Sequence, residues 1–406
     1  MNRETYRLED LCTSKGSYGI GAPAVAYDAN KYTYLRITDI NDDGTLNRNG
    51  LMSVEDERAG DYLLKENDIV FARTGNSTGR TYFYDGRDGE LVYAGFLIKF
   101  SLDNKKVNPR ILKYYTHSQP YYDWVQSFDT GGTRGNINAK VFGAMPITLP
   151  PRYQQDRIVE ILKSFDDKIE LNRRINANLE VQAQALFRSW FVDFEPFRDG
   201  PFVDSELGKI PQGWKVGTLS EIGDVIGGGT PSKIVSEYYT DNGIAWITPK
   251  DLSTNNCKFT SKGETDISEL GYKNSSAKLM PRGSVLFSSR APIGYISIAK
   301  NEICTNQGFK SIVPKKAGTC FIYYFLRNNT SKIESMASGS TFKEASGGLM
   351  KSLEVIIPSN KILTAFEEAI QPLFNMQEHN EDENARLSAL RDTLLPKLMA
   401  GEINLH

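Results

Sequence analysis

Residues 154–191 have the sequence QQDRIVEILKSFDDKIELNRRINANLEVQAQALFRSWF, with no proline or glycine. Apolar and amide residues recur in it at alternating intervals of four and three: Ile158, Leu162, Phe165, Ile169, Asn172, Asn176, Leu179, Ala183, Leu186 and Trp190. This spacing is typical of a coiled-coil helix. At 1.5 Å per residue, such a helix is on the order of 55 Å long.

The second half of the chain repeats the first after a shift of 208 residues. Leu149-Pro150 has its counterpart in Ile357-Pro358, and the asparagine pair recurs at the same offset. The second series is Phe366, Ile370, Leu373, Gln377, Asn380, Asn384, Leu387, Arg391, Leu394 and Leu398. The pattern predicts a duplicated half-molecule with internal two-fold character. Such a molecule suits a ligand with two half-sites, and duplex DNA is the foremost one.

The second helical segment is less regular than the first. Pro372 is expected to kink it or to mark a helix start. Gln377 and Arg391 interrupt its apolar seam, and Gly401 marks its end. We therefore expect a second long helix with a weaker apolar face.

The paired asparagines predict how the two helices align. If the helices are antiparallel about a two-fold axis, Asn172 lies level with Asn384, and Asn176 lies level with Asn380. Asparagine in an apolar seam lowers stability but fixes the register. The alternative is that these side chains face solvent and interrupt the seam.

Two globular segments, 1–150 and 201–358, share a plan of short β-type runs with glycine and Asn/Asp between them. One helix is expected near 110–127. We predict an α+β protein with pseudo-two-fold symmetry. Its two similar α/β domains are separated by two helical segments, 151–200 and 359–406, which form an antiparallel coiled coil.

The composition indicates an ordinary globular protein, with 40% hydrophobic and 24% charged residues. No apolar run approaches the ~18 residues of a membrane span, and no signal peptide is expected. The four scattered cysteines fit a reducing cytoplasm and argue against a zinc site or a disulfide framework.

The net charge of −2 hides an uneven distribution. The helical segments 151–200 and 359–406 carry −1 and −4, which leaves +3 for the rest of the chain. This distribution permits a local basic face, but an ordinary solvated surface explains it equally well.

The sequence patterns of common catalytic sites are missing. The chain contains no GxxxxGK[ST] phosphate loop, no HExxH, no GxSxG and no Asp/Asn-Pro-Pro-aromatic motif. It has three histidines. The stretch Gly227-Gly228-Gly229-Thr230-Pro231 resembles a ligand-cradling loop, but the early proline and the lack of a GxGxxG pattern favour a turn.

Two loops in each half have the composition of a nucleic-acid contact. Small residues let backbone N–H groups approach phosphates, arginine can bind guanine and asparagine adenine. Each loop is also consistent with an ordinary turn, but recurrence in both halves favours function. The candidate residues are Arg73, Thr74, Asn76, Arg80, Arg134, Asn136 and Lys140 in the first half, and Ser289, Arg290, Thr341 and Lys343 in the second.

An aromatic cluster closes the first helix: Phe187, Trp190, Phe191, Phe194 and Phe197. We expect it to cap the coiled coil or to pack on a globular domain, and any exposed part would mark a partner surface. Trp190 and Phe191, together with the four asparagines, are the candidate assembly residues.

Three stretches and the order of segments resemble one protein family. The stretches are NDIVFARTG at 67–75, QDRIV at 155–159 and LFRSWFVDFEP at 186–196. Together with the order domain–helix–domain–helix, they are similar to the specificity subunits of Type I restriction–modification enzymes, and the resemblance covers essentially the whole chain. The second repeat departs from it, because Leu363 stands where the first has Gln155.

The resemblance implies two target-recognition domains, each binding one half of a bipartite double-stranded DNA sequence, with the helices as a spacer. It implies a non-catalytic chain that recruits two methyltransferase subunits for adenine N6 methylation, and restriction–translocase subunits for cleavage. S-adenosylmethionine, ATP and Mg²⁺ would belong to those partners, and this chain would hold no cofactor.

Two other classes of function compete with this interpretation. The chain could be a DNA methyltransferase or nuclease in its own right, against which the missing motifs count. It could also be a scaffold whose coiled coil joins proteins and whose domains bind something other than DNA.

Overall fold

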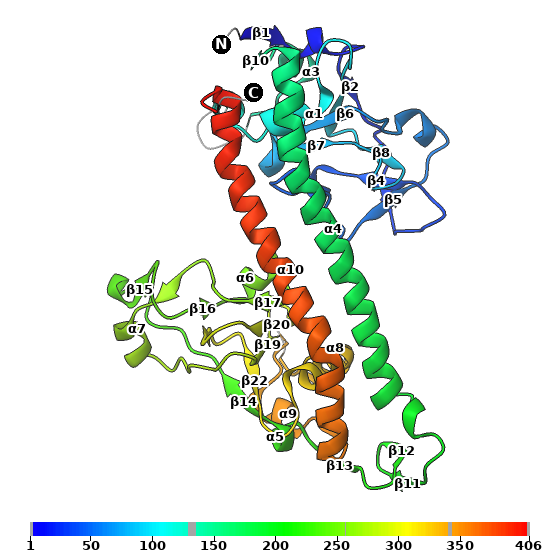
Figure 1. Cartoon of the computed structure of the whole chain (residues 1–406), viewed down its shortest axis with the longest axis vertical. Coiled ribbons are helices and arrows are strands. Elements are labelled where there is room, and N and C mark those ends of the chain that lie inside the picture. Colours follow the sequence, from blue (N-terminus) through cyan, green and yellow to red (C-terminus); the bar gives the residue numbers. More distant parts are fainter. Residues whose placement is uncertain (1–2, 129–134, 256, 340–342, 404–406) are drawn as a thin grey trace. The chain divides into compact units, whose positions relative to one another are not determined.

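The computed structural model describes residues 3–128, 135–255, 257–339 and 343–403. The chain divides into two compact units, each containing a globular domain and part of both long helices (Figure 1). The first unit consists of Met1–Lys168 and Arg386–His406, and the second of Ile169–Ala385.

Three small sheets build the globular part of the first unit. Strands β1 (Glu4–Arg7) and β10 (Pro146–Leu149) pair antiparallel. A four-stranded sheet has the order β2 (Ser17–Tyr18), β9 (Leu97–Ser101), β6 (Asp68–Ala72) and β7 (Thr81–Phe83). A second has the order β3 (Ala24–Val25), β5 (Met52–Val54), β4 (Thr33–Leu35) and β8 (Leu91–Tyr93), with β4 and β8 parallel. All residues of β6 are buried, as expected of a central strand.

The single helix expected near 110–127 is in fact two helices, α1 (Pro109–Tyr115) and α2 (Gln119–Gln126). Pro120 has no N–H to continue the hydrogen bonding of α1, and it lies in the first turn of α2, where that group needs no partner. The other helices of this part are α3 (Ala139–Gly143), η1 (Leu8–Leu11), η2 (Ile37–Asp39), η3 (Ala59–Tyr62) and η4 (Gly75–Ser77).

The second unit contains a five-stranded sheet in the order β14 (Gly223–Gly227), β22 (Lys310–Pro314), β19 (Val285–Ser289), β20 (Ile293–Ala299) and β17 (Phe259–Thr260). Its strand pairs are β11 (Phe202–Ser205) with β12 (Gly208–Pro211), β13 (Lys215–Thr218) with β23 (Glu354–Ile357), β15 (Tyr239–Thr240) with β18 (Asp266–Ile267), and β16 (Trp246–Ile247) with β21 (Cys304–Thr305). Its shorter helices are α5 (Leu219–Ile222), α6 (Pro249–Thr254), α7 (Glu269–Lys273), α8 (Thr319–Met336), α9 (Gly347–Ser352), η5 (Glu195–Phe197) and η6 (Ser236–Tyr238).

The two globular parts have the same plan, which confirms the predicted pair of similar domains. The antiparallel pair β1–β10 has its counterpart in β13–β23, and the parallel pair β4–β8 in β16–β21. The sheet β2-β9-β6-β7 corresponds to β14-β22-β19-β20. Helix α8 packs on β20 and β19 in the second unit (Figure 1).

Two long helices complete the fold, α4 (Arg152–Phe191) and α10 (Asn360–Ala400). Helix α10 does not begin at Pro372 but runs through it. Pro372 lies on the exposed face, where water can bind the carbonyl group that the proline leaves without a donor. Gly401, with φ 72°, follows the last residue of α10, as the sequence predicts. The four-segment division at 150, 200 and 358 stays a prediction. The compact units divide the chain in another way, because each unit contains part of both long helices.

Each unit has a core to which the helices contribute. In the first unit, Ile158 and Leu162 of α4 and Leu398 of α10 join the domain's buried residues. In the second, Phe187 of α4 and Phe366 of α10 pack with the residues of α8. The apolar positions of the predicted seam therefore face the domains as well as the neighbouring helix.

Candidate nucleic-acid interface

The first candidate loop leaves the end of β6 and is held in a defined shape. The N–H of Gly79 donates to the carbonyl of Ala72 at 2.9 Å, and the N–H of Ala72 donates to the carbonyl of Arg80 at 2.8 Å. Gly75 and Gly79 have φ of 71° and 85°, a conformation that glycine adopts without strain. The residues between them are thus fixed in a tight turn at the edge of the domain.

The two candidate loops of the first unit come together in space. The N–H of Ile137 donates to the carbonyl of Arg73 at 3.0 Å, and Nη1 of Arg73 donates to Oδ1 of Asn136 at 3.5 Å. Arg73 follows a strand and Asn136 precedes α3, and 62 residues separate them in the sequence. The structure therefore brings both residues to one surface.

Two exposed aromatic rings surround this arginine. The guanidinium carbon of Arg73 lies 5.3 Å from the ring centre of Tyr18 and 5.8 Å from that of Phe96. These two residues are 44% and 55% exposed, so solvent or a ligand can reach them. An arginine beside exposed rings offers fork-shaped hydrogen bonding and stacking in one place, the two contacts that nucleic-acid bases accept.

Sequence reasoning missed Tyr18 and Phe96 as site residues. Tyr18 lies in β2, and its hydroxyl accepts from the N–H of Ala139 at 3.1 Å. Phe96 lies between β8 and β9, and its carbonyl accepts from the N–H of Arg73 at 3.1 Å. Both contacts depend on strand pairing between distant segments, which no local pattern reveals.

The other candidates of the first unit differ in how they are placed. Nε of Arg80 lies 2.7 Å from Oδ1 of Asp42, and its Nη1 donates to the carbonyl of Ile40 at 3.1 Å, so this arginine stabilises its own domain. Thr74 is half-buried before η4, while Asn76 and Lys140 are exposed. Arg134 lies outside the described residues.

The second unit brings its two loops together in the same way. The N–H of Ala345 donates to the carbonyl of Ser289 at 2.9 Å. Nη1 of Arg290 lies 3.5 Å from Oε2 of Glu344, and Nζ of Lys310 lies 3.1 Å from Oε1 of that carboxylate. Glu344 thus corresponds to Asn136, but Ser289 is the backbone counterpart of Arg73, and Arg290 lies one residue further along the loop.

One predicted contact in the second unit is wrong as a direct contact. Ser289 is fully buried, and its hydroxyl donates to the carbonyl of Gly308 at 3.1 Å, so its side chain cannot reach a base. Its hydrogen bond to Gly308 instead stabilises the backbone of the loop. Lys343 is exposed, and Thr341 lies outside the described residues.

The predicted asparagine layer forms within the second unit. Nδ2 of Asn172 donates to Oδ1 of Asn384 at 3.0 Å, and Nδ2 of Asn380 donates to Oδ1 of Asn176 at 2.8 Å. Gln377 joins this layer, because its Nε2 donates to the carbonyl of Asn176 at 3.1 Å. The paired amides are those expected from the sequence, and Gln377, which was predicted to interrupt the apolar seam, extends this polar layer.

The aromatic cluster at the end of α4 packs on the core of the second unit, and packing on a globular domain was one of its two predicted roles. The ring centre of Phe191 lies 4.7 Å from that of Phe366, and Trp190 lies 5.8 Å from the same ring. Phe191 is buried and Trp190 half-buried in this core. Their role in assembly stays a prediction, and of the two side chains the half-buried Trp190 is the more accessible.

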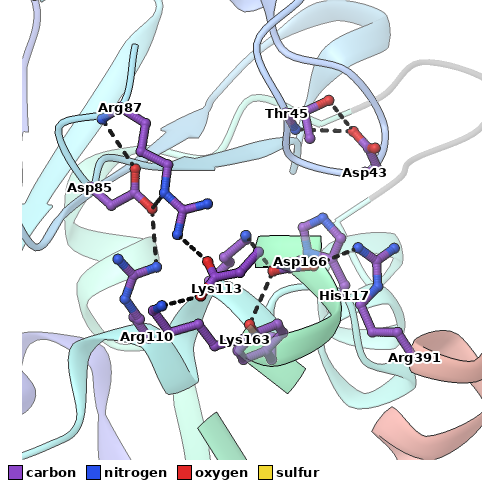
Figure 2. Close-up of polar contacts among 12 residues, drawn as sticks. Asp43, Thr45, Asp85, Arg87, Arg110, Lys113, His117, Lys163, Asp166 and Arg391 are labelled. Atoms are coloured by element: carbon purple, nitrogen blue, oxygen red, sulfur yellow. Dashed lines mark hydrogen bonds and ion pairs between the residues drawn. The ribbon is translucent and has the colours of Figure 1, made fainter. Parts of the chain in front are cut away.

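A network of charges attaches the first domain to the helices of its own unit (Figure 2). Asp166 of α4 accepts from Nζ of Lys113 at 2.6 Å and from Nη1 of Arg391 at 2.9 Å. Burial alone would raise the pKa of Asp166, but these two cations lower it below its ordinary value. Nη2 of Arg87 adds a bond to Asp167 at 2.6 Å.

The second domain is attached to its helices by a buried lysine. Nζ of Lys258 donates to Oε2 of Glu180 at 2.8 Å and to Oε1 of Gln377 at 2.9 Å, and it lies 3.5 Å from the ring centre of Phe374. Burial lowers the pKa of Lys258 to about 8. Burial alone would raise the pKa of Glu180, but Lys258 and Arg327 lower it to about 2.

Two further observations concern only the residues that the structure describes. None of their helices is long and apolar enough to cross a membrane. No three of their His, Cys, Asp or Glu side chains lie close enough together to hold a metal ion.

Comparison with known proteins identifies the family. The sequence profile described as "Type I restriction modification DNA specificity domain" matches residues 2–181 and again 211–387. The chain is 28% identical over 405 residues to the specificity subunit of the Type I restriction enzyme HindI of Haemophilus influenzae, covering 84% of this chain and 87% of the relative. It is 38% identical over 190 residues to the MjaIX specificity subunit of Methanocaldococcus jannaschii, covering 44% and 43%.

A solved structure has the same fold. The crystal structure of a Type-I restriction-modification system S subunit from M. genitalium aligns with a TM-score of 0.59 at 15% identity, over 100% of this chain and 97% of that one. With two profile matches that together span most of its length, the chain belongs to the Type I restriction–modification DNA specificity family.

Proposed function

We propose that this member of the family recognises a bipartite DNA target, with each globular domain binding one half-site. The observation that carries the proposal is the convergence of two polar loops at equivalent places in both units. The shared frame holds different side chains, Arg73 with Asn136 in one unit and Arg290 with Glu344 in the other. A duplicated frame with different contact residues is what two different half-sites require.

In the first domain, Arg73 is the proposed base-reading residue. Its guanidinium lies between Tyr18 and Phe96 with Nε buried, so its Nη donors are the ones that can meet O6 and N7 of a guanine or a phosphate. Asn136, Asn76, Thr74 and Lys140 are the proposed supporting contacts. Arg80 has a smaller role, because Asp42 and Ile40 already bind it.

The long helices are proposed to set the distance between the half-sites and to recruit partners. The 40 residues of α4 correspond to roughly 60 Å, more than the ~34 Å that separates successive major-groove faces. The partners are two methyltransferase subunits, which supply S-adenosylmethionine chemistry, and restriction–translocase subunits, which use ATP and Mg²⁺. The chain itself contributes recognition and assembly, not catalysis.

The asparagine layer is proposed to fix the register of the helices and hence the gap between half-sites. Asn172→Leu removes the amide that binds Asn384 and Glu383, so helix pairing should be no weaker but less specific. We expect methylated sites with a second gap length. Asn178→Leu, a change at an exposed position of α4, is the control. An unchanged gap in Asn172→Leu would refute the register role.

Sequencing of modified bases tests the proposed function directly. DNA is taken from cells that express the chain with its neighbouring methyltransferase. We expect N6-methyladenine in one split motif with a fixed gap, and none when the chain is deleted. An active, complexed methyltransferase without such a motif would favour a scaffold, and methylation by the purified chain alone would favour an enzyme.

The same assay tests the assignment of Arg73. Arg73→Ala should abolish discrimination in one half of the motif and leave the other half and the gap unchanged. Arg58→Ala is the matched control, because the side chain of Arg58 is 71% exposed and forms a 3.8 Å ion pair with Asp56. If both variants methylate the wild-type motif equally, Arg73 does not read DNA.

A further inference from the structure

A glycine-rich loop after β14 is clamped to the second domain. The N–H of Gly229 donates to the carbonyl of Thr305 at 2.9 Å, and Nε1 of Trp246 donates to the carbonyl of Gly229 at 2.9 Å. A Cβ atom at position 228 would lie 1.9 Å from the carbonyl oxygen of Asn306, so only glycine fits there. The base of the loop is therefore fixed in place.

The first domain contains the same clamp. The N–H of Ile20 donates to the carbonyl of Tyr93 at 3.1 Å, and the hydroxyl of Tyr34 donates to the carbonyl of Ile20 at 2.8 Å. A Cβ atom at Gly19 would lie 2.2 Å from the carbonyl oxygen of Tyr93. Tyr34 takes the place of Trp246, because β4 pairs with β8 as β16 pairs with β21. The duplication has preserved the clamp while the residues beyond it differ.

Beyond the clamp, the loop of the second domain carries an exposed tip. The N–H of Val235 donates to the carbonyl of Ser232 at 3.3 Å, which closes a turn with Lys233 and Ile234 at its centre. Ile234 is 96% exposed, far more than any other large apolar side chain in the described part of the chain. A single exposed apolar residue needs no explanation. Ile234, however, lies at the tip of a turn and next to Lys233, where it can contact a ligand.

The loop borders a cleft of about 770 Å³ that also contains a predicted contact residue. Thr230, Lys233, Gln307 and Arg290 line it. Lys250, also in the lining, is paired with Glu264 at 2.7 Å. Lys233 makes no ion pair or hydrogen bond with any residue that the structure describes, so its charge is available to a ligand.

We propose that the turn Ser232–Val235 is a third DNA-contacting element of the second domain, with Lys233 on a backbone phosphate and Ile234 against a base edge or sugar in a groove. The inference rests on the proposed function and adds to it a contact that lies outside the two polar loops. Apolar side chains at such tips contact thymine methyl groups or enter between base steps. The clamp fixes the base of the loop, so that binding has fewer residues to order.

Salt dependence tests the contact of Lys233. The full chain, assembled with its methyltransferase subunits, is titrated with a duplex that carries its methylated motif, over a series of salt concentrations. Lys233→Gln should lower the slope of log affinity against log salt by about 0.9, the value for one phosphate. Base preference should not change. Lys209→Gln, an exposed lysine in the hairpin β11–β12, should leave the slope at the wild-type value.

Substitution of Ile234 tests the apolar contact. Ile234→Ala should weaken binding to the motif about tenfold, as expected for the loss of a buried aliphatic side chain, and Ile234→Asp should weaken it further. Leu207→Ala, in the turn of the β11–β12 hairpin, is the control. Because Ile234 is 96% exposed, its variants should keep the wild-type melting temperature.

The outcomes separate the two claims. If the wild-type complex binds and methylates its motif while the Lys233 and Ile234 variants keep wild-type slope and affinity, the inference is wrong and the proposed function stands. If the wild-type complex has no sequence preference at all, both are overturned. A changed slope for Lys233→Gln together with weaker binding by Ile234→Ala supports the inference.

Discussion

The two domains are attached to their helices by different chemistry. In the first unit, the buried Asp166 of α4 pairs with two partly exposed cations, Lys113 of the domain and Arg391 of α10 (Figure 2). The second unit also has partly exposed pairs, Arg282–Glu378, Lys300–Asp382 and Arg327–Glu180. In addition, the side chain of Lys258, 7% exposed, lies among aromatic rings and binds a carboxylate and an amide. The two attachments therefore differ in the buried cation of the second unit, because a buried charge that loses its partner costs more than an exposed one.

This difference indicates which of the two attachments tolerates mutation better. Asp166 keeps a second cation when one is lost, because Lys113 and Arg391 approach it from different elements. Lys258 joins Glu180, Gln377 and Tyr324 through one buried ammonium group, and the cation that Glu180 would keep without it, Arg327, is 41% exposed. We therefore expect mutations in the second attachment to have the larger effects.

The largest effect is expected from Lys258→Met. The substitution keeps the length of the side chain but leaves the buried end of Glu180 with Arg327 as its remaining cation. Breaking a buried pair from one side costs about 3 kcal/mol or more in unfolding free energy. Chemical denaturation measures it. The double variant Lys258→Met/Glu180→Gln should recover part of the loss, and a double variant that is less stable still would contradict the pairing.

A smaller effect is expected from pH, through Glu381. Burial raises the pKa of this carboxyl from 4.5 to about 7, although the N–H groups of Lys258 and Phe259 donate to it. The folded protein thus keeps a proton that the unfolded chain releases above pH 4.5. This contribution to stability is complete below that pH and is lost as the pH rises through 7.

Glu381→Gln removes this titration. Relative to the variant, the wild type should lose about 2 kcal/mol of unfolding free energy between pH 5 and pH 8, given ~1.4 kcal/mol for each pKa unit. Melting temperatures of both proteins across this range provide the measurement. Glu368→Gln, at an exposed position of α10, is the control. A constant difference between wild type and Glu381→Gln would show that Glu381 does not titrate there.

The smallest effect is expected from Arg87→Gln in the first unit. Arg87 lies near both Asp85 and Asp167, but 36% of its side chain is exposed, so water compensates for lost contacts. The cost should stay below about 1 kcal/mol and should vanish at high salt. Denaturation at two salt concentrations measures it. If Arg87→Gln costs as much as Lys258→Met, the contrast between the two attachments is wrong.

Periodic features of the fold could be predicted from the sequence. The 4-3 spacing predicted α4 to within two residues, from Gln154 where the helix begins at Arg152, and it also predicted which asparagines meet. Such features repeat over many residues, so one exception does not hide them. The break between α1 and α2 was missed because it depends on a single residue, Pro120.

The candidate site was predicted only in part, for a physical reason. Loop composition and recurrence pointed to Arg73, Asn136 and Arg290, and the structure brings the first two together. The composition of a loop does not show which of its side chains are buried, so Ser289 was wrongly predicted to contact DNA. The rings beside Arg73 and the lysine at position 258 reach their partners through strand pairing and helix packing, which leave no mark in the neighbouring sequence.

The attachment of each domain also determines where a chimera can be joined. A graft of residues 201–358 alone would place Lys258 against a foreign helix, without the Glu180 and Gln377 that it needs. The boundaries between the compact units lie inside α4 and α10, near Lys168–Ile169 and Ala385–Arg386. A chimera joined there would keep each domain together with the helical residues that it contacts. Recombination between relatives should therefore succeed when crossovers fall within the helices. The unit to exchange is therefore a domain together with its matching turns of helix.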